Sequence, residues 1–178
     1  IVGGEVVEVF AVGAVTGGWL DDRIGSKRTI LFAVSGLFLA TLGVVSVTVD
    51  GLGTAARTDT ILFFVHYPVA APGEGMFNTL TEQVFLFFGI LIGIFGGPAQ
   101  AASRTMVSRL VPPDMVGEFY GLYALSGKAT AFIAPLAVGL FTGLYASQRA
   151  GISVILVFLA VGLLLMLPVR EERTTRAH

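Results

Sequence analysis

The sequence predicts an all-α membrane protein whose 178 residues form five transmembrane helices. Hydrophobic residues make up 54% of the chain and charged residues only 13%, about half the charged fraction of a typical soluble domain. The mean hydropathy is +0.84. Several stretches of ~20 residues are almost uncharged, which is the helix length that crosses ~30 Å of hydrocarbon. We therefore expect membrane spans rather than the core helices of a soluble domain.

The composition also limits the classes of function. A net charge of -1 gives no support for nucleic-acid binding, and the absence of cysteine excludes disulfides and thiol chemistry. The chain has two histidines, His66 and His178, and no phosphate-binding loop or Ser-His-acid set, so we predict no metal site, no cofactor and no enzyme activity. The chain starts without an initiator Met or a signal peptide, and we expect it to be a piece of a longer protein.

Each predicted span is an apolar run bounded by charged or turn-forming residues. The first span carries two glutamates and stops at Asp21, and the second has no charged side chain. The third span is rich in glycine, and the fourth contains Lys128 and Pro135. The five predicted spans cover residues 2–20, 29–49, 83–104, 118–146 and 151–169.

The basic residues predict the orientation, because Lys and Arg beside spans stay on the cytoplasmic side. They cluster after the first, third and fifth spans, whereas the opposite loops hold only Arg57 and Arg149. The first span is therefore expected to start outside. The prediction places cytoplasmic turns at 21–28 and 110–117, an outside loop at 50–82, an outside turn at 147–150 and a cytoplasmic tail at 170–178.

The outside loop contains an apolar run, residues 61–70, that is too short to cross a membrane. A β-hairpin on the outer surface fits this run, followed by a Pro-Gly-Glu-Gly turn at 72–75 and a second arm from Met76 to Thr81. His66 is a lone histidine in this run and is given no functional role.

The third span places small and polar residues on one helical face. Their spacing is four, three, four and four residues, so the face either allows close helix packing or lines an aqueous cavity. These residues are Gly89, Gly93, Gly96, Gln100 and Arg104. Gln100 and Ser103 could hydrogen-bond a polar solute, whereas Arg104 could simply extend to the cytoplasmic boundary.

Lys128 is the most informative charge within a predicted span. A rise of 1.5 Å per residue places it ~16 Å from Gly117, near mid-membrane, where a charge costs ~2.5 kcal/mol or more. Ser126 and Thr130 flank it. We therefore hypothesise that Lys128 helps to bind a carboxylate-bearing solute or couples transport to protons. The alternative is a buried structural ion pair.

Two glutamates of the first span are the proposed partners at similar depth. Counting back from Asp21 places Glu8 ~20 Å and Glu5 ~24 Å from the cytoplasmic face. Glu8 is therefore a candidate partner of Lys128. At the cytoplasmic side, Glu118 is expected either to favour the N-terminus of the fourth span or to form an ion-pair network with Arg104 and Arg109.

A resemblance to a known family enters at residues 17–31. The pattern Gly18-x-Leu20-x-Asp22-Arg23-x-Gly25-x-Lys27 resembles the signature of the major facilitator superfamily, which joins the second and third helices of a six-helix half. Asp21 stands where a small residue is usual, and Ser26 stands where Arg is common. The resemblance implies a conformational gate made by Gly18, Asp22, Arg23, Gly25, Lys27 and Arg28, with the partner of Asp22 elsewhere in the protein.

Four further blocks resemble the vacuole-effluxer-like branch of this superfamily, which includes the autophagy-linked vacuolar amino-acid effluxer. The blocks are 96–104, 109–113, 118–128 and 147–151. This resemblance implies that residues 1–178 are a C-terminal transmembrane half with helices eight to twelve of twelve. The implied partners are the missing N-terminal half, the lipid bilayer and a small-molecule solute.

The resemblance also implies a function. The expected activity is that of a permease that moves a small polar solute by alternating access, with amino-acid efflux as the leading class and proton coupling left open. A non-transporting membrane scaffold and a drug or sugar exporter are the alternatives. The expected location is the inner membrane of a bacterium or the vacuolar membrane of a fungus.

Overall fold

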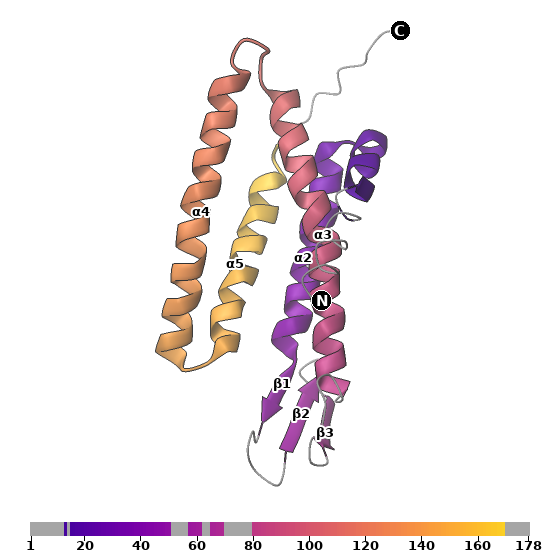
Figure 1. Ribbon diagram of the computed structural model, residues 1–178, viewed down its shortest axis with the longest axis vertical. Helices are drawn as coiled ribbons and strands as arrows, with labels where there is room; N and C mark the ends of the chain where they lie inside the picture. Colours follow the sequence, from indigo (N-terminus) through magenta and orange to yellow (C-terminus); the bar gives the residue numbers. More distant parts are fainter. Residues whose placement is uncertain (1–12, 14, 51–56, 62–64, 70–79, 170–178) are drawn as a thin grey trace, which may run out of the picture.

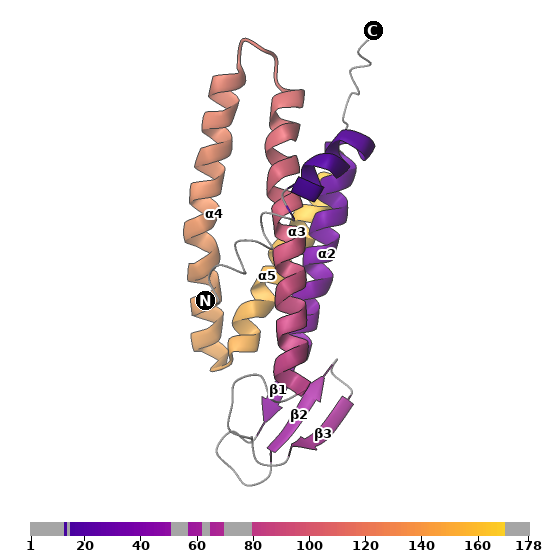
Figure 2. The ribbon, with the colours of Figure 1, turned by 45° about the vertical axis from the view of Figure 1, so that its right-hand side comes forward.

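The structure is a computed structural model in which the helices run side by side along the long axis, with a small sheet beyond one end (Figures 1 and 2). The residues that it describes are 13, 15–50, 57–61, 65–69 and 80–169. Four described helices are long and apolar enough to cross a membrane: α2 (Ser26–Ser46), α3 (Leu80–Leu110), α4 (Val116–Tyr145) and α5 (Gln148–Met166). The prediction of an all-α, multi-pass membrane protein is confirmed.

The helix α3 extends beyond its predicted span at both ends, whereas α2 and α5 have the predicted lengths but begin and end three residues earlier. The third span was expected at 83–104, but α3 runs from Leu80 to Leu110. Glu82 lies in its first turn and Arg109 in its last turn. Charged residues limit the part of a helix that lies in hydrocarbon, not the helix itself, so hydropathy underestimates the helix length. The first span can be compared only at Gly13 and residues 15–24, because its other residues lie outside the described ranges.

The predicted cytoplasmic turn at 21–28 is much tighter in the structure. Residues 15–24 are helical and α2 begins at Ser26, so Gly25 alone separates the two helices. Gly25 has φ 91° and ψ 154°, a conformation that a residue with a Cβ rarely adopts. The charges that predicted a loop therefore lie at helix ends.

Glycines on α2 let the rings of α3 approach its backbone. The ring of Phe95 lies over Gly36 and the ring of Phe88 lies over Gly43. The residue numbers rise along α2 as they fall along α3, so the two helices pack antiparallel. A Cβ added at Gly36 would lie 2.6 Å from Phe95 Cγ. Small residues at such positions allow the close contact by which membrane helices associate.

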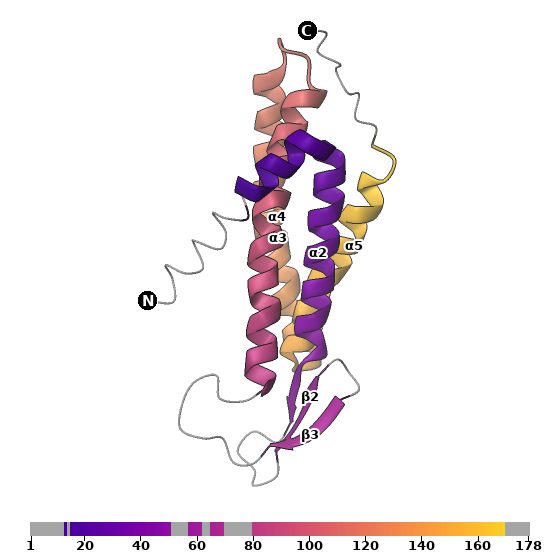
Figure 3. The same ribbon diagram turned by 90° about the vertical axis from the view of Figure 1, so that its right-hand side faces the viewer.

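The N-terminal helical segment, residues 15–24, crosses the C-terminal half of α3 (Figure 3). A Cβ added at Gly17 would lie 2.7 Å from Pro98 Cβ, and one at Gly13 would lie 2.7 Å from the carbonyl oxygen of Ile94. Pro98 lies inside α3 and has no N–H, so it leaves the carbonyl of Ile94 without its helical donor. Gly13 packs against that carbonyl.

Two basic side chains join α2 and α5 at opposite ends. Near the N-terminus of α2, Lys27 Nζ donates to the carbonyl oxygen of Leu167 over 2.8 Å. Near the N-terminus of α5, Arg149 Nε donates to the carbonyl oxygen of Val45 over 2.9 Å. Each side chain starts near the N-terminus of one helix and satisfies a carbonyl near the C-terminus of the other. Arg149, an exception to the cytoplasmic clustering of basic residues, thus has a structural role.

The outside loop forms a three-stranded antiparallel sheet in the order β1-β2-β3. Its strands are β1 (Thr48–Asp50), β2 (Arg57–Ile61) and β3 (Val65–Val69). The β-hairpin predicted in this loop is confirmed in kind, but its arms differ where they can be compared, because residues 76–79 of the predicted second arm lie outside the described ranges. The pairing joins β2 to β3, with Thr60 opposite His66, whereas Leu80 and Thr81 begin α3 instead of ending a strand. Asp59 was treated as a boundary of the apolar run, and this concealed β2. The predicted turn at 72–75 lies outside the described residues.

Candidate functional site

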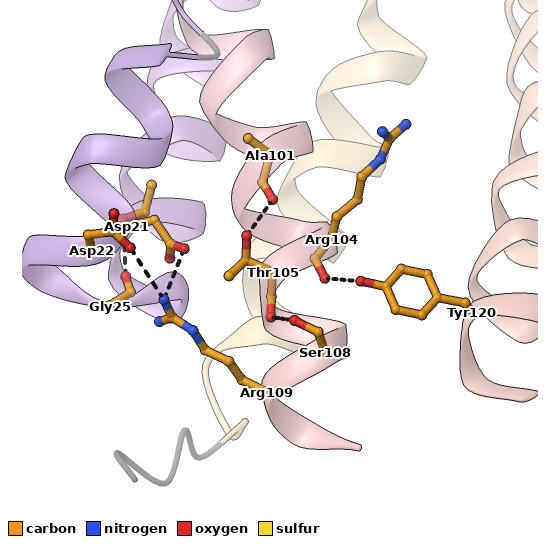
Figure 4. A network of polar contacts seen from close by, with 10 residues as sticks. Asp21, Asp22, Gly25, Ala101, Arg104, Thr105, Ser108, Arg109 and Tyr120 are labelled. Carbon is orange, nitrogen blue, oxygen red and sulfur yellow. Dashed lines mark hydrogen bonds and ion pairs between the residues drawn. The ribbon is translucent and has the colours of Figure 1, made fainter. Parts of the chain in front are cut away.

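The C-terminal ends of the N-terminal segment and α3 meet in an ion-pair cluster, which we call the gate cluster: Asp21, Asp22 and Arg109 (Figure 4). Arg109 Nη2 lies 3.3 Å from Asp21 Oδ2 and donates a hydrogen bond to it. The same nitrogen lies 3.8 Å from Asp22 Oδ1. The side chain of Asp21 is only 4% exposed, whereas that of Asp22 is 82% exposed. Asp21 is therefore the principal carboxylate of this cluster.

This arrangement changes the prediction for the signature. Asp22 was expected to carry the gate with a partner elsewhere in the protein, and Asp21 was treated only as a departure from the pattern. Within the described residues, Arg109 already lies beside both carboxylates. The available signal was the spacing: Gly13, Gly17 and Asp21 recur every four residues, so they share one helical face. That face packs on α3.

The two glycines of the signature have different roles. Gly18 was expected to allow close helix packing, but a Cβ added there would meet no atom within 4 Å. Gly17 supplies the close contact instead. Gly25 permits the sharp turn, and its carbonyl oxygen accepts hydrogen bonds from both the N–H and the hydroxyl of Thr29, which tie the turn to the first residues of α2.

The basic residues of the signature also differ in the contacts that they make. Lys27 reaches the C-terminal carbonyl of α5, as described above. The guanidinium carbon of Arg23 lies 4.0 Å from the centre of the Trp19 ring, one turn earlier, which is a cation–π geometry. Arg28 is exposed. The signature thus connects several helices at the cytoplasmic end.

The predicted network of Arg104, Arg109 and Glu118 has a different form in the structure. The ion pairs shown for Arg109 are those with the two aspartates. Arg104 accepts a hydrogen bond through its carbonyl from Tyr120 Oη over 3.0 Å, which links α3 to α4. Glu118 is exposed in the first turn of α4, where a carboxylate favours a helix N-terminus.

An open depression of about 660 Å³ lies on α4 beside Arg104 of α3, and we call it the α3–α4 cavity. Arg104 contributes from α3, and all other lining residues come from α4. These are Tyr123, Ala124, Ser126, Gly127, Thr130, Ala131, Ala134 and Pro135. The lining holds one permanent positive charge and no carboxylate. This volume falls in the range of small-molecule sites.

The hydroxyl groups near the cavity donate within their own helices. Ser126 Oγ donates to the carbonyl of Tyr123 over 2.8 Å, and Thr130 Oγ1 donates to the carbonyl of Ser126 over 2.9 Å. On α3, Ser103 Oγ donates in the same way to the carbonyl of Ala99. Gln100 is exposed one turn from Arg104 and does not line the cavity. The predicted residues Ser126 and Thr130 do line it.

Lys128 lies beside the α3–α4 cavity without lining it. Its side chain is exposed, and it shares a helical face with Ala124, Ala131 and Pro135, which do line the cavity. Within the ranges that the structure describes, Lys128 makes no hydrogen bond or ion pair. Glu5 and Glu8 lie outside the described residues, so the pairing of Glu8 with Lys128 remains a prediction.

Comparison with protein families gives one match over most of the chain. The model of the family described as "Vacuole effluxer Atg22 like" matches residues 23–178. Autophagy-related protein 22-2 of Emericella nidulans is 32% identical over 179 aligned positions, which cover 84% of this chain and 29% of that protein. Autophagy-related protein 22 of Cryptococcus neoformans is 32% identical over 96 residues, covering 54% of this chain and 17% of that protein.

A bacterial relative extends the comparison. The uncharacterized MFS-type transporter YxiO of Bacillus subtilis is 24% identical over 152 residues, which cover 70% of this chain and 36% of that protein. No solved structure matches the chain. The chain thus spans between 17% and 36% of the length of these three relatives.

Proposed function

Because this chain belongs to the vacuole effluxer Atg22-like family, we propose that it is part of a secondary transporter that moves a small polar solute by alternating access. Four apolar helices and the name of the bacterial relative support transport. The description of the family as a vacuole effluxer supports efflux, and amino acids are the substrate class that we favour on the resemblance given in the sequence analysis. We expect no catalytic activity and no cofactor, and proton coupling is left to experiment.

The observation that carries this proposal is the α3–α4 cavity. It lies on α4 beside α3, both of which are long enough to cross a membrane, and its wall combines small apolar residues with Arg104, Ser126 and Thr130. A wall that is mostly apolar with a few polar groups is typical of a small-molecule site. A scaffold that only locked helices together would gain contact energy by filling this space.

We propose that the gate cluster closes the cytoplasmic end of the same pathway. Arg109 ties α3 to the segment that carries Asp21, and Tyr120 ties α3 to α4. A change in the position of α3 would alter both contacts. The remainder of the transporter, including an N-terminal half, is proposed to supply the other wall of the pathway, and the membrane is proposed to be the inner membrane in a bacterium or the vacuolar membrane in a fungus.

Transport by the full-length protein in proteoliposomes tests the proposal. The probes are the twenty standard amino acids, each radiolabelled, with and without an imposed pH gradient. We expect counterflow of at least one amino acid above that of empty liposomes. If none of them moves, amino-acid transport is rejected. A parallel panel of sugars and cationic dyes separates an exporter of another substrate class from a scaffold, which would move none of the probes.

Lys128 is proposed to act in solute binding or proton coupling at this site. Its isolated charge beside the cavity motivates the proposal. Lys128→Ala in the full-length protein is expected to reduce amino-acid flux or its dependence on the pH gradient. Unchanged flux from a normally inserted variant would reject this role. A structure that placed Glu8 beyond ~6 Å from Lys128 would reject their pairing, because that separation exceeds one bridging water.

A further inference from the structure

The α3–α4 cavity has two chemically different ends. We propose that Arg104 binds the negative group of the solute, while Ser126, Thr130 and the carbonyl of Ala131 accept hydrogen bonds from its positively charged group. This inference rests on the proposed function for the role of the cavity, and it adds the orientation of the bound solute. Arg104 lies nearer the end of the bundle that is predicted to be cytoplasmic, and the acceptors lie deeper in the membrane.

The cationic end is formed by a side chain that the fold leaves available. Arg104 uses its carbonyl to hold Tyr120, but its guanidinium has no hydrogen bond or ion pair among the described residues. Figure 4 shows this guanidinium directed away from the gate cluster. No carboxylate lines the cavity to neutralise it. A guanidinium presents several N–H donors in a planar fork that matches a carboxylate.

The other end offers acceptors and almost no donors. The hydroxyl hydrogens of Ser126 and Thr130 are used by backbone carbonyls, so the lone pairs of their oxygens remain for a solute. Pro135 lies inside α4 and has no N–H, so it leaves the carbonyl of Ala131 without its helical donor. Such a freed carbonyl is tolerated at membrane depth where it borders a cavity. Among the lining residues, such a wall of acceptors favours an ammonium group over a carboxylate, and the charge of Lys128, which borders the cavity without lining it, makes no contact with the ammonium group in this arrangement.

The separation of the two ends follows from the helix rise. Tyr120 reaches the carbonyl of Arg104, and Ser126 lies six residues further along α4, a rise of ~9 Å. Ser126 is therefore the acceptor nearest to Arg104, and Thr130 and Ala131 lie ~6 and ~8 Å beyond it. Helical side chains lean toward the N-terminus of their helix. The side chain of Arg104 therefore leans toward the outer side, which shortens the separation from Ser126 and Thr130.

Three small probes of matched shape test this orientation by thermal stability of the purified full-length protein. Alanine carries both groups, propionate lacks the ammonium group, and ethylamine lacks the carboxylate. In Arg104→Gln, the apparent affinity for propionate is expected to fall about tenfold or more, as for loss of a charged hydrogen bond. The affinity for ethylamine is expected to stay within about twofold. In Thr130→Val the affinity for ethylamine is expected to fall about tenfold or more, and the affinity for propionate is expected to stay within about twofold.

Two further variants complete the test. Arg104→Lys keeps the charge and is expected to recover part of the affinity for propionate. Ser153→Ala removes a hydroxyl that makes the same type of intrahelical bond on α5, and it is expected to change neither probe. Absence of stabilisation by propionate, or an equal loss of both probes in Arg104→Gln, would overturn the inference. Propionate binding that depends on Arg104 in a protein that fails to move any amino acid would reject amino-acid transport and retain the polarity of the cavity.

Discussion

The two sides of this helix bundle differ sharply in how they are packed. Half of the residues in the most apolar stretch of α2 are buried inside the structure, whereas none of the residues in the most apolar stretch of α4 are buried. On the α2 side, glycines admit aromatic rings and basic side chains join the helix ends. On the α4 side, the α3–α4 cavity lies open along α4 from Tyr123 to Pro135 and meets α3 at Arg104. The packed side therefore has the character of a framework, and the open side holds the groups that we propose to meet the solute.

The largest expected effect comes from filling a close contact on the packed side. Gly17→Ala would drive a Cβ into Pro98, where backbone atoms leave little room to adjust. We expect a loss of about 1–3 kcal/mol in stability, as for other overpacked sites. The measurement is thermal unfolding of the full-length protein in detergent.

Gly18→Ala is the matched control for this substitution. Its added Cβ would meet no atom within 4 Å, and Ala is favoured over Gly in a helix by about 0.5–1 kcal/mol. We therefore expect unchanged or slightly higher stability. Equal loss in the two variants would mean that the contact between Gly17 and Pro98 does not hold the segment against α3.

The next effect concerns the gate cluster. Asp21→Asn removes the charge of the buried carboxylate that faces Arg109, and a loss of about 1 kcal/mol is expected, because Arg109 is partly exposed and solvent screens the pair. Asp22→Asn changes an exposed carboxylate and should cost less than about 0.5 kcal/mol. Thermal unfolding at low salt compares the two variants. If Asp22→Asn proved the more damaging, the assignment of the gate to Asp21 would be wrong.

The contrast between the aspartates shows what the sequence could supply. Apolar runs predicted the spans, and the glycine and charge pattern predicted a tight cytoplasmic turn. The pattern could not tell that Asp21 faces α3, because burial depends on which face of the segment packs, and the resemblance to the family signature favoured Asp22. The four-residue spacing of Gly13, Gly17 and Asp21 carried that information in part.

At the α3–α4 cavity, the sequence predicted two of the lining residues but not the direction of the charged one. Ser126 and Thr130 were predicted as solute-facing and do line it. Arg104 was assigned to an ion-pair network or to the membrane boundary, because its direction depends on how α3 and α4 are placed. The hydrogen bond from Tyr120 Oη to the carbonyl of Arg104 joins the two helices, and no sequence pattern predicts such a contact. The acceptor character of the hydroxyls likewise depends on intrahelical bonds.

A smaller effect is expected from the two contacts that join α2 and α5. Lys27→Met and Arg149→Met each remove a side-chain donor to a C-terminal carbonyl, and a loss of about 0.5 kcal/mol is expected for each. The contacts lie at opposite ends of the helices, so the losses should add in the double variant. Thermal unfolding of the unchanged protein, the two single variants and the double variant gives a double-mutant cycle. Strong non-additivity would show that α2 and α5 respond as one unit.

The smallest expected effect on stability lies on the open side, and it sharpens the comparison most. Lys128→Ala removes an exposed side chain without a partner in the described ranges, so the change should stay within about 0.5 kcal/mol. Flux is nevertheless expected to fall, because the charge borders the cavity. Gly18→Ala, which is also nearly silent in stability, provides the control for insertion and flux. A large loss of stability in Lys128→Ala would instead reveal a structural ion pair, with Glu8 as the first partner to test by Glu8→Gln.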